Sequence, residues 1–234
     1  MIPNSSDVGW RSLNMRKLKA YRPTWRWEKM IGSAACLKWS FRDLANLDAA
    51  LKFVPGRSAV IQAGGNLGLF PKRLAEEFGA VYTFEPDPHL FEQLVYNARE
   101  PNIVKIQAAL GSVRNKVKMA CHRRDSSGRS SHEGLTHVAG SGIIPQLRID
   151  DFAFLNIDLI YLDIEGFEFF ALQGAEETIR RCMPVIVVEI NANLVHYGLT
   201  ADALRKYIVE LGYKHVLTMN SDEVFVPRPL DATP

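Results

Sequence analysis

The sequence of 234 residues predicts an α/β fold built on an open, mostly parallel sheet. Five short apolar runs alternate with segments of helical periodicity, which is typical of β/α units with parallel strands. These runs are residues 59–63, 81–84, 103–106, 158–163 and 185–190. A hairpin follows, because residues 214–219 and 223–226 flank a turn of Asn, Ser and Asp. Together they predict a seven-stranded sheet with helices on both faces and a C-terminal antiparallel hairpin.

Helical segments connect the predicted strands. Residues 40–54 place three leucines at helical spacing, and a Pro-Gly pair ends that segment. Pro71 lies in the first turn of the next helix, where its missing N–H costs little. Asp87 and Thr200 are typical N-caps for two later helices. We expect one continuous helix over residues 166–181.

Composition limits the class of protein. With 47% hydrophobic residues, the chain can bury a full core. No run approaches the ~18 apolar residues of a membrane span, and residues 1–20 lack the apolar core of a signal peptide. The three cysteines match no metal-binding spacing, which fits a reducing compartment. We therefore expect a cytoplasmic protein without a membrane span; its oligomeric state is not predicted.

The N-terminal part differs in charge from the rest. Residues 1–30 contain seven basic and two acidic side chains, although the whole chain has a formal net charge of only +2. Trp25, Trp27 and Trp39 follow in or near a helix-like segment. We expect residues 1–54 to form a basic arm with helices, and residues 55–234 to form the main domain.

A glycine-rich turn follows the first predicted strand. Residues 64–68 read Gly-Gly-Asn-Leu-Gly, and glycine lets backbone approach a ligand closely. Glu85 stands at the end of the second strand, roughly 20 residues after the turn. A carboxylate at that place holds the two ribose hydroxyls in mononucleotide-binding folds. This stretch therefore predicts a site for a nucleoside-bearing cofactor.

The glycine spacing narrows the choice of cofactor. No register of the three glycines gives G-x-G-x-x-G, and the turn lacks the Lys-Ser/Thr of a P-loop. An NAD-dependent oxidoreductase is therefore disfavoured. S-adenosylmethionine has a ribose and no phosphate, so it is compatible with such a turn.

Three ordered motifs give a family resemblance. Residues 62–68 (QAGGNLG), 84–88 (FEPDP) and 163–168 (DIEGFE) resemble the FkbM family of S-adenosylmethionine-dependent methyltransferases. The resemblance covers about residues 59–227 and implies a Rossmann-like class I methyltransferase fold for the main domain. Gln62 replaces an acid of the family, and Tyr161 replaces a common lysine. A strand-end glutamine with a short basic arm also resembles versions carried by bacteriophages.

The predicted cofactor site gathers residues from three strand ends. Its members are Gln62, Ala63, Gly64, Gly65, Asn66, Gly68, Glu85, Pro86, Gln107 and Ala108. The side-chain amide of Gln107 could pair with an adenine edge, or Gln107 could simply end a strand. Gln62 lacks the charge that attracts the methionine ammonium, so we expect binding weaker by ~1 kcal/mol than with an acid.

The predicted catalytic residues are Asp163, Glu165 and Glu189. Ligands of an open parallel sheet bind beyond the carboxyl ends of its strands, where these carboxylates stand. We expect Asp163 or Glu165 to orient or deprotonate an acceptor hydroxyl, with support from Glu189. Alternatively, the carboxylates cap the next helix and bind backbone amides. Asp163, Glu189 and Asn191 would also suit Mg²⁺, but we expect no metal.

We expect residues 121–142 to be the least structured internal segment of the chain. They combine Ser, Gly, His and Arg with almost no apolar periodicity, as in a functional lid. Arg123, Arg124 and Arg129 would suit an anionic acceptor, while His122, His132 and His137 could reach a reaction centre. We expect this segment to cover the substrate.

By analogy with the FkbM family, the resemblance implies methyl transfer from S-adenosylmethionine to a hydroxyl of a sugar or another small metabolite. One alternative is a nucleic-acid-directed methyltransferase or binding protein that uses the basic arm. Another is a cofactor-binding protein that has lost catalysis, because Gln62 and Tyr161 depart from the family pattern.

Overall fold

A seven-stranded sheet forms the centre of the computed structural model, which describes residues 43–121 and 136–229. The strand order is β10-β11-β9-β8-β1-β2-β3. The strands are β1 (Ala59–Ala63), β2 (Ala80–Phe84), β3 (Ile103–Ile106), β8 (Leu159–Leu162), β9 (Val185–Glu189), β10 (Tyr213–Met219) and β11 (Asp222–Pro227). The pairs among β3, β2, β1, β8 and β9 are parallel, and β11 is antiparallel to both β9 and β10. The predicted mostly parallel sheet with a C-terminal hairpin is confirmed.

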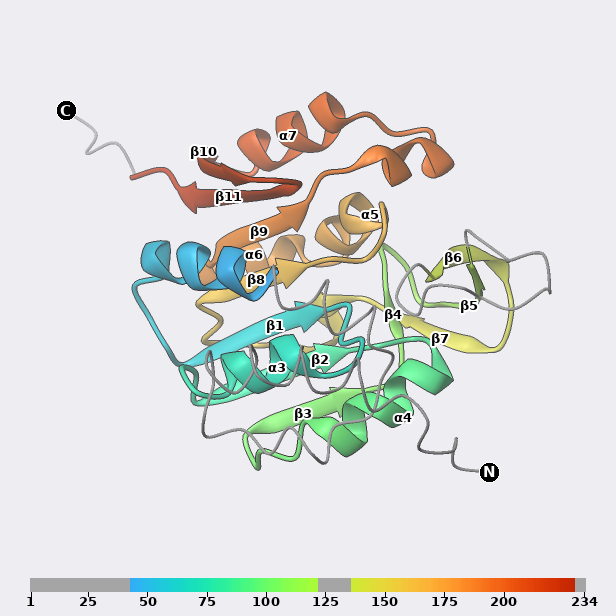
Figure 1. Ribbon diagram of the computed structural model, residues 1–234. Helices are drawn as coiled ribbons and strands as arrows, with labels where there is room; N and C mark the ends of the chain where they lie inside the picture. Colours follow the sequence, from blue (N-terminus) through green and yellow to red (C-terminus); the bar gives the residue numbers. More distant parts are fainter. Residues whose placement is uncertain (1–42, 122–135, 230–234) are drawn as a thin grey trace.

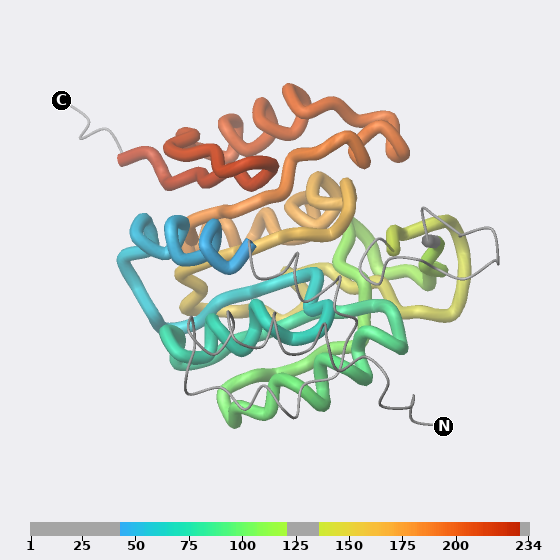
Figure 2. Tube along the Cα trace, in the orientation of Figure 1, coloured from blue at the N-terminus to red at the C-terminus, as the bar shows by residue number. Residues whose placement is uncertain are grey.

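Helices cover both faces of this sheet, as predicted (Figure 1). Helical residues 43–50, α3 (Leu69–Leu74) and α4 (Pro88–Asn97) pack on one face. The other face is covered by α5 (Glu168–Gln173), α6 (Glu176–Cys182) and α7 (Ala201–Glu210). Figure 2 traces this path from the helix at residues 43–50, which lies against the sheet. The strand order reverses between β1 and β8, where α/β sheets bind ligands.

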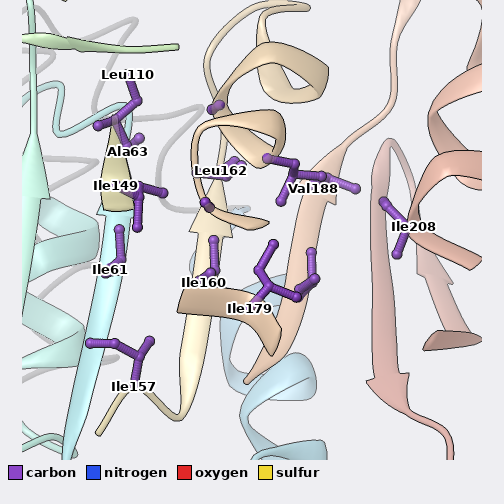
Figure 3. Close-up of a cluster of buried hydrophobic side chains, with 14 of the residues drawn as sticks. Ile61, Ala63, Leu110, Ile149, Ile157, Ile160, Leu162, Ile179, Val188 and Ile208 are labelled. Carbon is purple, nitrogen blue, oxygen red and sulfur yellow. The ribbon is translucent and has the colours of Figure 1, made fainter. Parts of the chain in front are cut away.

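The core explains why the apolar runs become the central strands. All five residues of β1 are buried, as expected for a parallel strand covered on both faces. Ile61, Ile160 and Val188 from three neighbouring strands point to the same cluster as Ile179 of α6 and Ile208 of α7 (Figure 3). Each such side chain contributes roughly 1.5–3 kcal/mol by leaving water.

The helix caps follow the sequence signals. Asp87 accepts hydrogen bonds from the backbone N–H groups of His89 and Leu90 at the start of α4. Thr200 accepts one from the N–H of Ala203 at the start of α7. Both predicted N-caps are confirmed.

The expected single helix over residues 166–181 is wrong, because the chain forms α5 and α6 with a break at Gly174. A Cβ on Gly174 would lie 2.1 Å from the carbonyl oxygen of Gly111. The close approach of the Gly111 backbone therefore requires glycine at position 174. The Asp150 carboxylate then binds the first turn of α6 by accepting from the N–H groups of Glu177 and Thr178. Contacts distant in sequence therefore divide the helix.

A second, four-stranded sheet lies between β3 and β8 in the chain. It has the order β4-β7-β5-β6, with β4 (Ala109–Leu110), β5 (Asn115–Cys121), β6 (Thr136–Ser141) and β7 (Ile144–Leu147). Figure 1 shows it beyond the ends toward which the arrows of β1 and β2 point. The prediction that residues 121–142 lack structure is wrong at 136–141, because β6 pairs antiparallel with β5. The 3-10 segments are η2 (Leu51–Phe53), η3 (Ile149–Phe152) and η4 (Ala192–Tyr197).

Several predictions concern residues outside the described ranges. The basic arm, Trp25, Trp27 and Trp39 lie there, as do Arg123, Arg124 and Arg129 with His122 and His132. The division of the chain after residue 54 also stays a prediction. Among the residues with described positions, no helix is long and apolar enough to pass through a membrane.

Candidate functional site

The glycine-rich turn joins β1 to the ends of its two neighbours. The N–H groups of Gly64 and Gly65 both donate to the carbonyl oxygen of Phe84, at 3.1 and 3.0 Å. Gly64 has a φ of 86°, and a Cβ there would lie 2.0 Å from the carbonyl oxygen of Asp163. Only glycine fits this close approach, which brings the turn against the predicted catalytic segment after β8.

Gln62, near the end of β1, hydrogen-bonds to the glycine-rich turn and to β2. Its side chain is fully buried. Its Nε2 donates to the carbonyl oxygen of Gly64 at 2.8 Å, and its Oε1 accepts from the Thr83 hydroxyl at 2.5 Å. An ionised acid could not donate to Gly64, so the amide is adapted to this turn. Its predicted effect on cofactor affinity stays a prediction.

Glu85 is fixed beside the same turn. One carboxylate oxygen accepts from the N–H of Asn66 at 2.8 Å, and the other accepts from the N–H of Asp87 at 2.9 Å. Burial raises the pKa of Glu85 to about 7, although these two hydrogen bonds oppose the rise. Each carboxylate oxygen can accept a second bond, so Glu85 could also receive hydroxyl donors.

The remaining predicted cofactor residues meet at neighbouring strand ends. The parallel register aligns Ala63 of β1 with Phe84 of β2, and Phe84 with Ile106 of β3. Pro86 and Gln107 therefore follow adjacent strand ends. Gln107 is exposed and Ala108 is buried, so the Gln107 amide is accessible to a ligand. Contact between these residues and a cofactor stays a prediction.

Carboxyl groups gather where β8 and β9 end. Burial raises the pKa of Glu189 at the end of β9, although the hydrogen bonds that it accepts from Ser221 and Asn191 oppose the rise. Burial, and then the charges of Glu189 and Glu165, raise the pKa of Asp163 well above its usual range. Burial and the charge of Glu189 also raise the pKa of Glu165 to about 7. The fold thus brings the three predicted catalytic residues together.

Glu168 has a different role from these carboxyl groups. It is completely buried, and its Oε1 accepts from the N–H groups of Ile164 and Gly166 at 2.9 and 3.4 Å. This is the backbone-binding alternative that the sequence left open, and the structure supports it for Glu168. Burial raises its pKa to about 8, despite these hydrogen bonds.

Tyr161 is buried on the face of the central sheet that α3 and α4 cover. Its ring lies 5.3 Å from that of Phe70, and its hydroxyl donates to Asp222 Oδ2 at 3.4 Å. Asn46 donates to the same oxygen at 2.9 Å. Burial raises the pKa of Asp222 to about 6. At the position of the family's lysine, the tyrosine hydroxyl therefore hydrogen-bonds a buried acid.

Sequence reasoning named Asn191, the N-cap of η4, as a possible Mg²⁺ ligand but missed Asn193. Asn193 Nδ2 donates to Glu165 Oε2 at 2.5 Å, and Asn191 Nδ2 donates to Glu189 Oε2 at 2.6 Å. The available signal was the Asn-Ala-Asn sequence just past β9, since residues after a strand end share the edge of the sheet where ligands bind.

The second sheet reaches this edge through β6. The hydroxyl of Tyr197 in η4 donates to the carbonyl oxygen of Val138 at 3.0 Å. The rings of His137 and His196 stack with their centroids 5.6 Å apart. His137 therefore lies against η4 from an ordered strand. In the described parts of the chain, no group of three or more His, Cys, Asp or Glu is arranged to hold a metal ion.

Comparison with known proteins matches residues 62–215, well over half of the chain, to the Methyltransferase FkbM domain. A comparison with curated proteins found no match.

Two solved structures are similar to this chain. A methyltransferase FkbM from Methylobacillus flagellatus KT is 16% identical with a TM-score of 0.46, and the match covers 92% of this chain and 60% of that chain. Magnesium protoporphyrin IX methyltransferase from Synechocystis PCC 6803, solved with bound SAM, is 11% identical with a TM-score of 0.50. That match covers 96% of this chain and 100% of the other.

Proposed function

The chain belongs to the FkbM family of S-adenosylmethionine-dependent methyltransferases, and from this premise we propose that it methylates a hydroxyl oxygen of a sugar or another small metabolite. S-adenosylmethionine supplies a methyl group on a positively charged sulfur. Methyl transfer forms an O–CH₃ bond and breaks the S–CH₃ bond, and the hydroxyl proton must go to a base. The following paragraphs give the observations that support this assignment.

The close approach of the glycine-rich turn to the segment after β8 supports the placement of the two substrates. A ligand seated at Gly64 and Gly65 would lie next to Asp163, because the Gly64 backbone leaves no room for a Cβ against that residue. Glu85 could hold ribose hydroxyls from the other side of the turn. The donor and the base would then share one edge of the sheet.

The single observation that carries the proposal is the carboxyl group of Glu165 at this edge. Its pKa of about 7, raised by burial and by Glu189, suits a group that takes up a proton at neutral pH. Burial and neighbouring charges raise the pKa of Asp163 well above its usual range, so it holds its proton more firmly than an ordinary carboxyl group does, and we favour Glu165 as the base. Sequence reasoning had left the choice between Asp163 and Glu165 open.

The carboxyl cluster also bears on the acceptor. Glu189, Glu165, Asp222 and Glu168 all act on Asp163 as negative neighbours. A neutral hydroxyl can donate to such groups, whereas an anion placed among them would be repelled. An anionic acceptor rests on Arg123, Arg124 and Arg129, and a nucleic-acid partner rests on residues 1–30. Both sets lie outside the described ranges, whereas the carboxyl groups around Asp163 favour a neutral acceptor, and this is the acceptor that we propose.

Transfer of radiolabelled methyl from S-adenosylmethionine to a panel of hydroxyl compounds tests the proposal. The panel contains monosaccharides, glycosides and small alcohols, with matched amines and thiols. We expect label on a hydroxyl compound together with S-adenosylhomocysteine. Glu165→Gln keeps an oxygen that can accept from Asn193, and it should lower the rate by roughly 10²-fold or more.

Two results would contradict the proposal. Label on amines or thiols alone would exclude O-methylation. Tight cofactor binding without S-adenosylhomocysteine across the panel would favour the alternative of lost catalysis.

A further inference from the structure

Glu165 has an uncommon backbone conformation for a residue with a side chain. Its φ is 59°, and the next residue, Gly166, has a φ of 95°. Residues with a Cβ rarely adopt the left-handed region, and such strain persists only where surrounding contacts hold it. Strained residues concentrate at functional sites.

The contacts that hold Glu165 come from the first turn of η4. A Cβ on Gly166 would lie 2.6 Å from the Asn193 carbonyl carbon and 2.7 Å from its oxygen, so the η4 backbone packs directly on the turn. From this position Asn193 Nδ2 donates to Glu165 Oε2 at 2.5 Å. Among the described residues, no side chain or backbone group donates to Glu165 Oε1. One carboxylate oxygen is therefore fixed while the other is left for a ligand.

Asn191 fixes Asn193 in turn. Its Oδ1 accepts from the N–H of Asn193 at 2.8 Å, and its Nδ2 donates to Glu189 Oε2 at 2.6 Å. The Ser221 hydroxyl donates to the other oxygen of Glu189 at 3.0 Å. The two asparagines thus connect Glu189, the last residue of β9, with Glu165 in the turn after β8.

We propose that Asn193 is a positioning residue that holds the Glu165 carboxylate in its reactive orientation, with Asn191 setting the place of Asn193. The reactive role of Glu165 rests on the proposed function, whereas the positioning itself rests on the contacts above. An amide suits this role because it donates a hydrogen bond and adds no charge.

The charged surroundings make the amide's contribution measurable. The charge of Glu189, the last residue of β9, acts on Glu165, and the charge of Glu165 acts on Asp163 after β8. The charges of Glu168 in α5 and of Glu165 also raise the pKa of the Tyr197 hydroxyl in η4. Burial and Glu189 favour protonation of Glu165, and the hydrogen bond from Asn193 is the contact that opposes them. Removing that donor should therefore make Glu165 hold its proton to higher pH.

The test compares Asn193→Leu with the matched control Asn102→Leu. Asn102 is also partly buried, and its side chain donates to the carbonyl oxygens of Ala75 and Phe78 at 3.0 and 2.9 Å, on the α3 side of the sheet. Both variants lose side-chain hydrogen bonds and should lose stability. The enzyme is saturated with S-adenosylhomocysteine, so the measurement needs no acceptor.

Two readouts follow Glu165 itself. Crystal structures of the complexes give the position of its carboxylate, and ¹³C-glutamate NMR gives its titration midpoint, with Glu165→Gln assigning the signal. In Asn193→Leu we expect a displaced carboxylate and a midpoint higher by about one pH unit, because hydrogen bonds to charged groups are of that strength. Asn102→Leu should leave both readouts unchanged. If Asn193→Leu does not fold, Asn193→Ala replaces it, with the same upward shift expected.

An unchanged carboxylate and midpoint in a folded Asn193 variant would overturn the proposal. Its failure can be told apart from failure of the proposed function. A shifted midpoint in Asn193→Leu, with full methyl transfer by Glu165→Gln, would support positioning and reject Glu165 as the base. An unchanged midpoint in Asn193→Leu, with methyl transfer lost in Glu165→Gln, would reject positioning and retain Glu165 as the base.

Discussion

Replacing Glu168 with glutamine separates its ionisation from its hydrogen bonds. The side chain is completely buried, and a glutamine oxygen could still accept from the N–H groups of Ile164 and Gly166. Among the described residues Glu168 Oε2 has no hydrogen-bond partner, so a charge on the carboxylate is compensated at Oε1 but not at Oε2. Glutamine instead places an N–H₂ group there, which costs about 1–3 kcal/mol as a buried donor without an acceptor.

The pH dependence has a definite sign. Burial raises the pKa of Glu168 to about 8 in the folded protein, while an unfolded glutamate titrates near ~4.3. Between these values the folded state holds a proton that the unfolded state has lost. The contribution of Glu168 to stability is therefore greatest at low pH and falls as pH rises toward 8. The total loss is on the order of 3–5 kcal/mol, since one pKa unit corresponds to about 1.4 kcal/mol.

Urea unfolding of wild type and Glu168→Gln at several pH values checks this reasoning. We expect the variant to be less stable at pH 5 and more stable, by roughly 1–3 kcal/mol, at pH 8.5. Glu92→Gln on the exposed side of α4 is the control, and it should follow wild type throughout. Glu85, Glu165 and Asp222 also titrate in this range, but they do so in all three proteins. A difference between wild type and Glu168→Gln that is constant with pH would refute the reasoning.

Two further predictions concern the glycine-rich turn. Gly64→Ala combines a positive φ with a Cβ 2.0 Å from a backbone oxygen of Asp163, so it should unfold the turn and abolish S-adenosylmethionine binding in calorimetry. Gly198→Ala also has a positive φ, but nothing lies within 4 Å of its Cβ, so it should cost only about 1 kcal/mol and keep binding. Equal affinities in the two variants would contradict this contrast. Gln62→Leu removes the side-chain partner of the Gly64 carbonyl and of the buried Thr83 hydroxyl. It should lower the free energy of unfolding by about 2–4 kcal/mol. A loss under ~1 kcal/mol in urea unfolding would show that these two hydrogen bonds contribute little to stability.

The fold was predictable where local patterns and tertiary contacts agree. The apolar run at residues 59–63 became β1, and the Asp87 and Thr200 signals became N-caps. The helix break at Gly174 was not predictable, because it depends on the backbone of Gly111, which lies far away in the sequence.

The strand β6 was missed for a similar reason. Its residues are half-buried or exposed, so they carry little apolar periodicity, and pairing with β5 sets their conformation. Such a pairing is formed across a long connection and leaves a weak signal in the strand itself.

The sequence was enough to predict which strand ends form the site. Parallel strands present their carboxyl ends at one edge, which brought Asp163, Glu165 and Glu189 together as expected. The side chains that orient them were not predictable in the same way. Asn193 reaches Glu165 only because η4 packs on Gly166, and Gln62 turns inward to Gly64 and Thr83.

A crystal structure with bound S-adenosylhomocysteine tests the central claim most directly. We predict that the ribose hydroxyls bind Glu85 and that the sulfur faces the turn after β8, with the Glu165 carboxylate on the side from which an acceptor hydroxyl would approach. A cofactor bound away from the glycine-rich turn, or a sulfur that faces away from Asp163 and Glu165, would contradict the account.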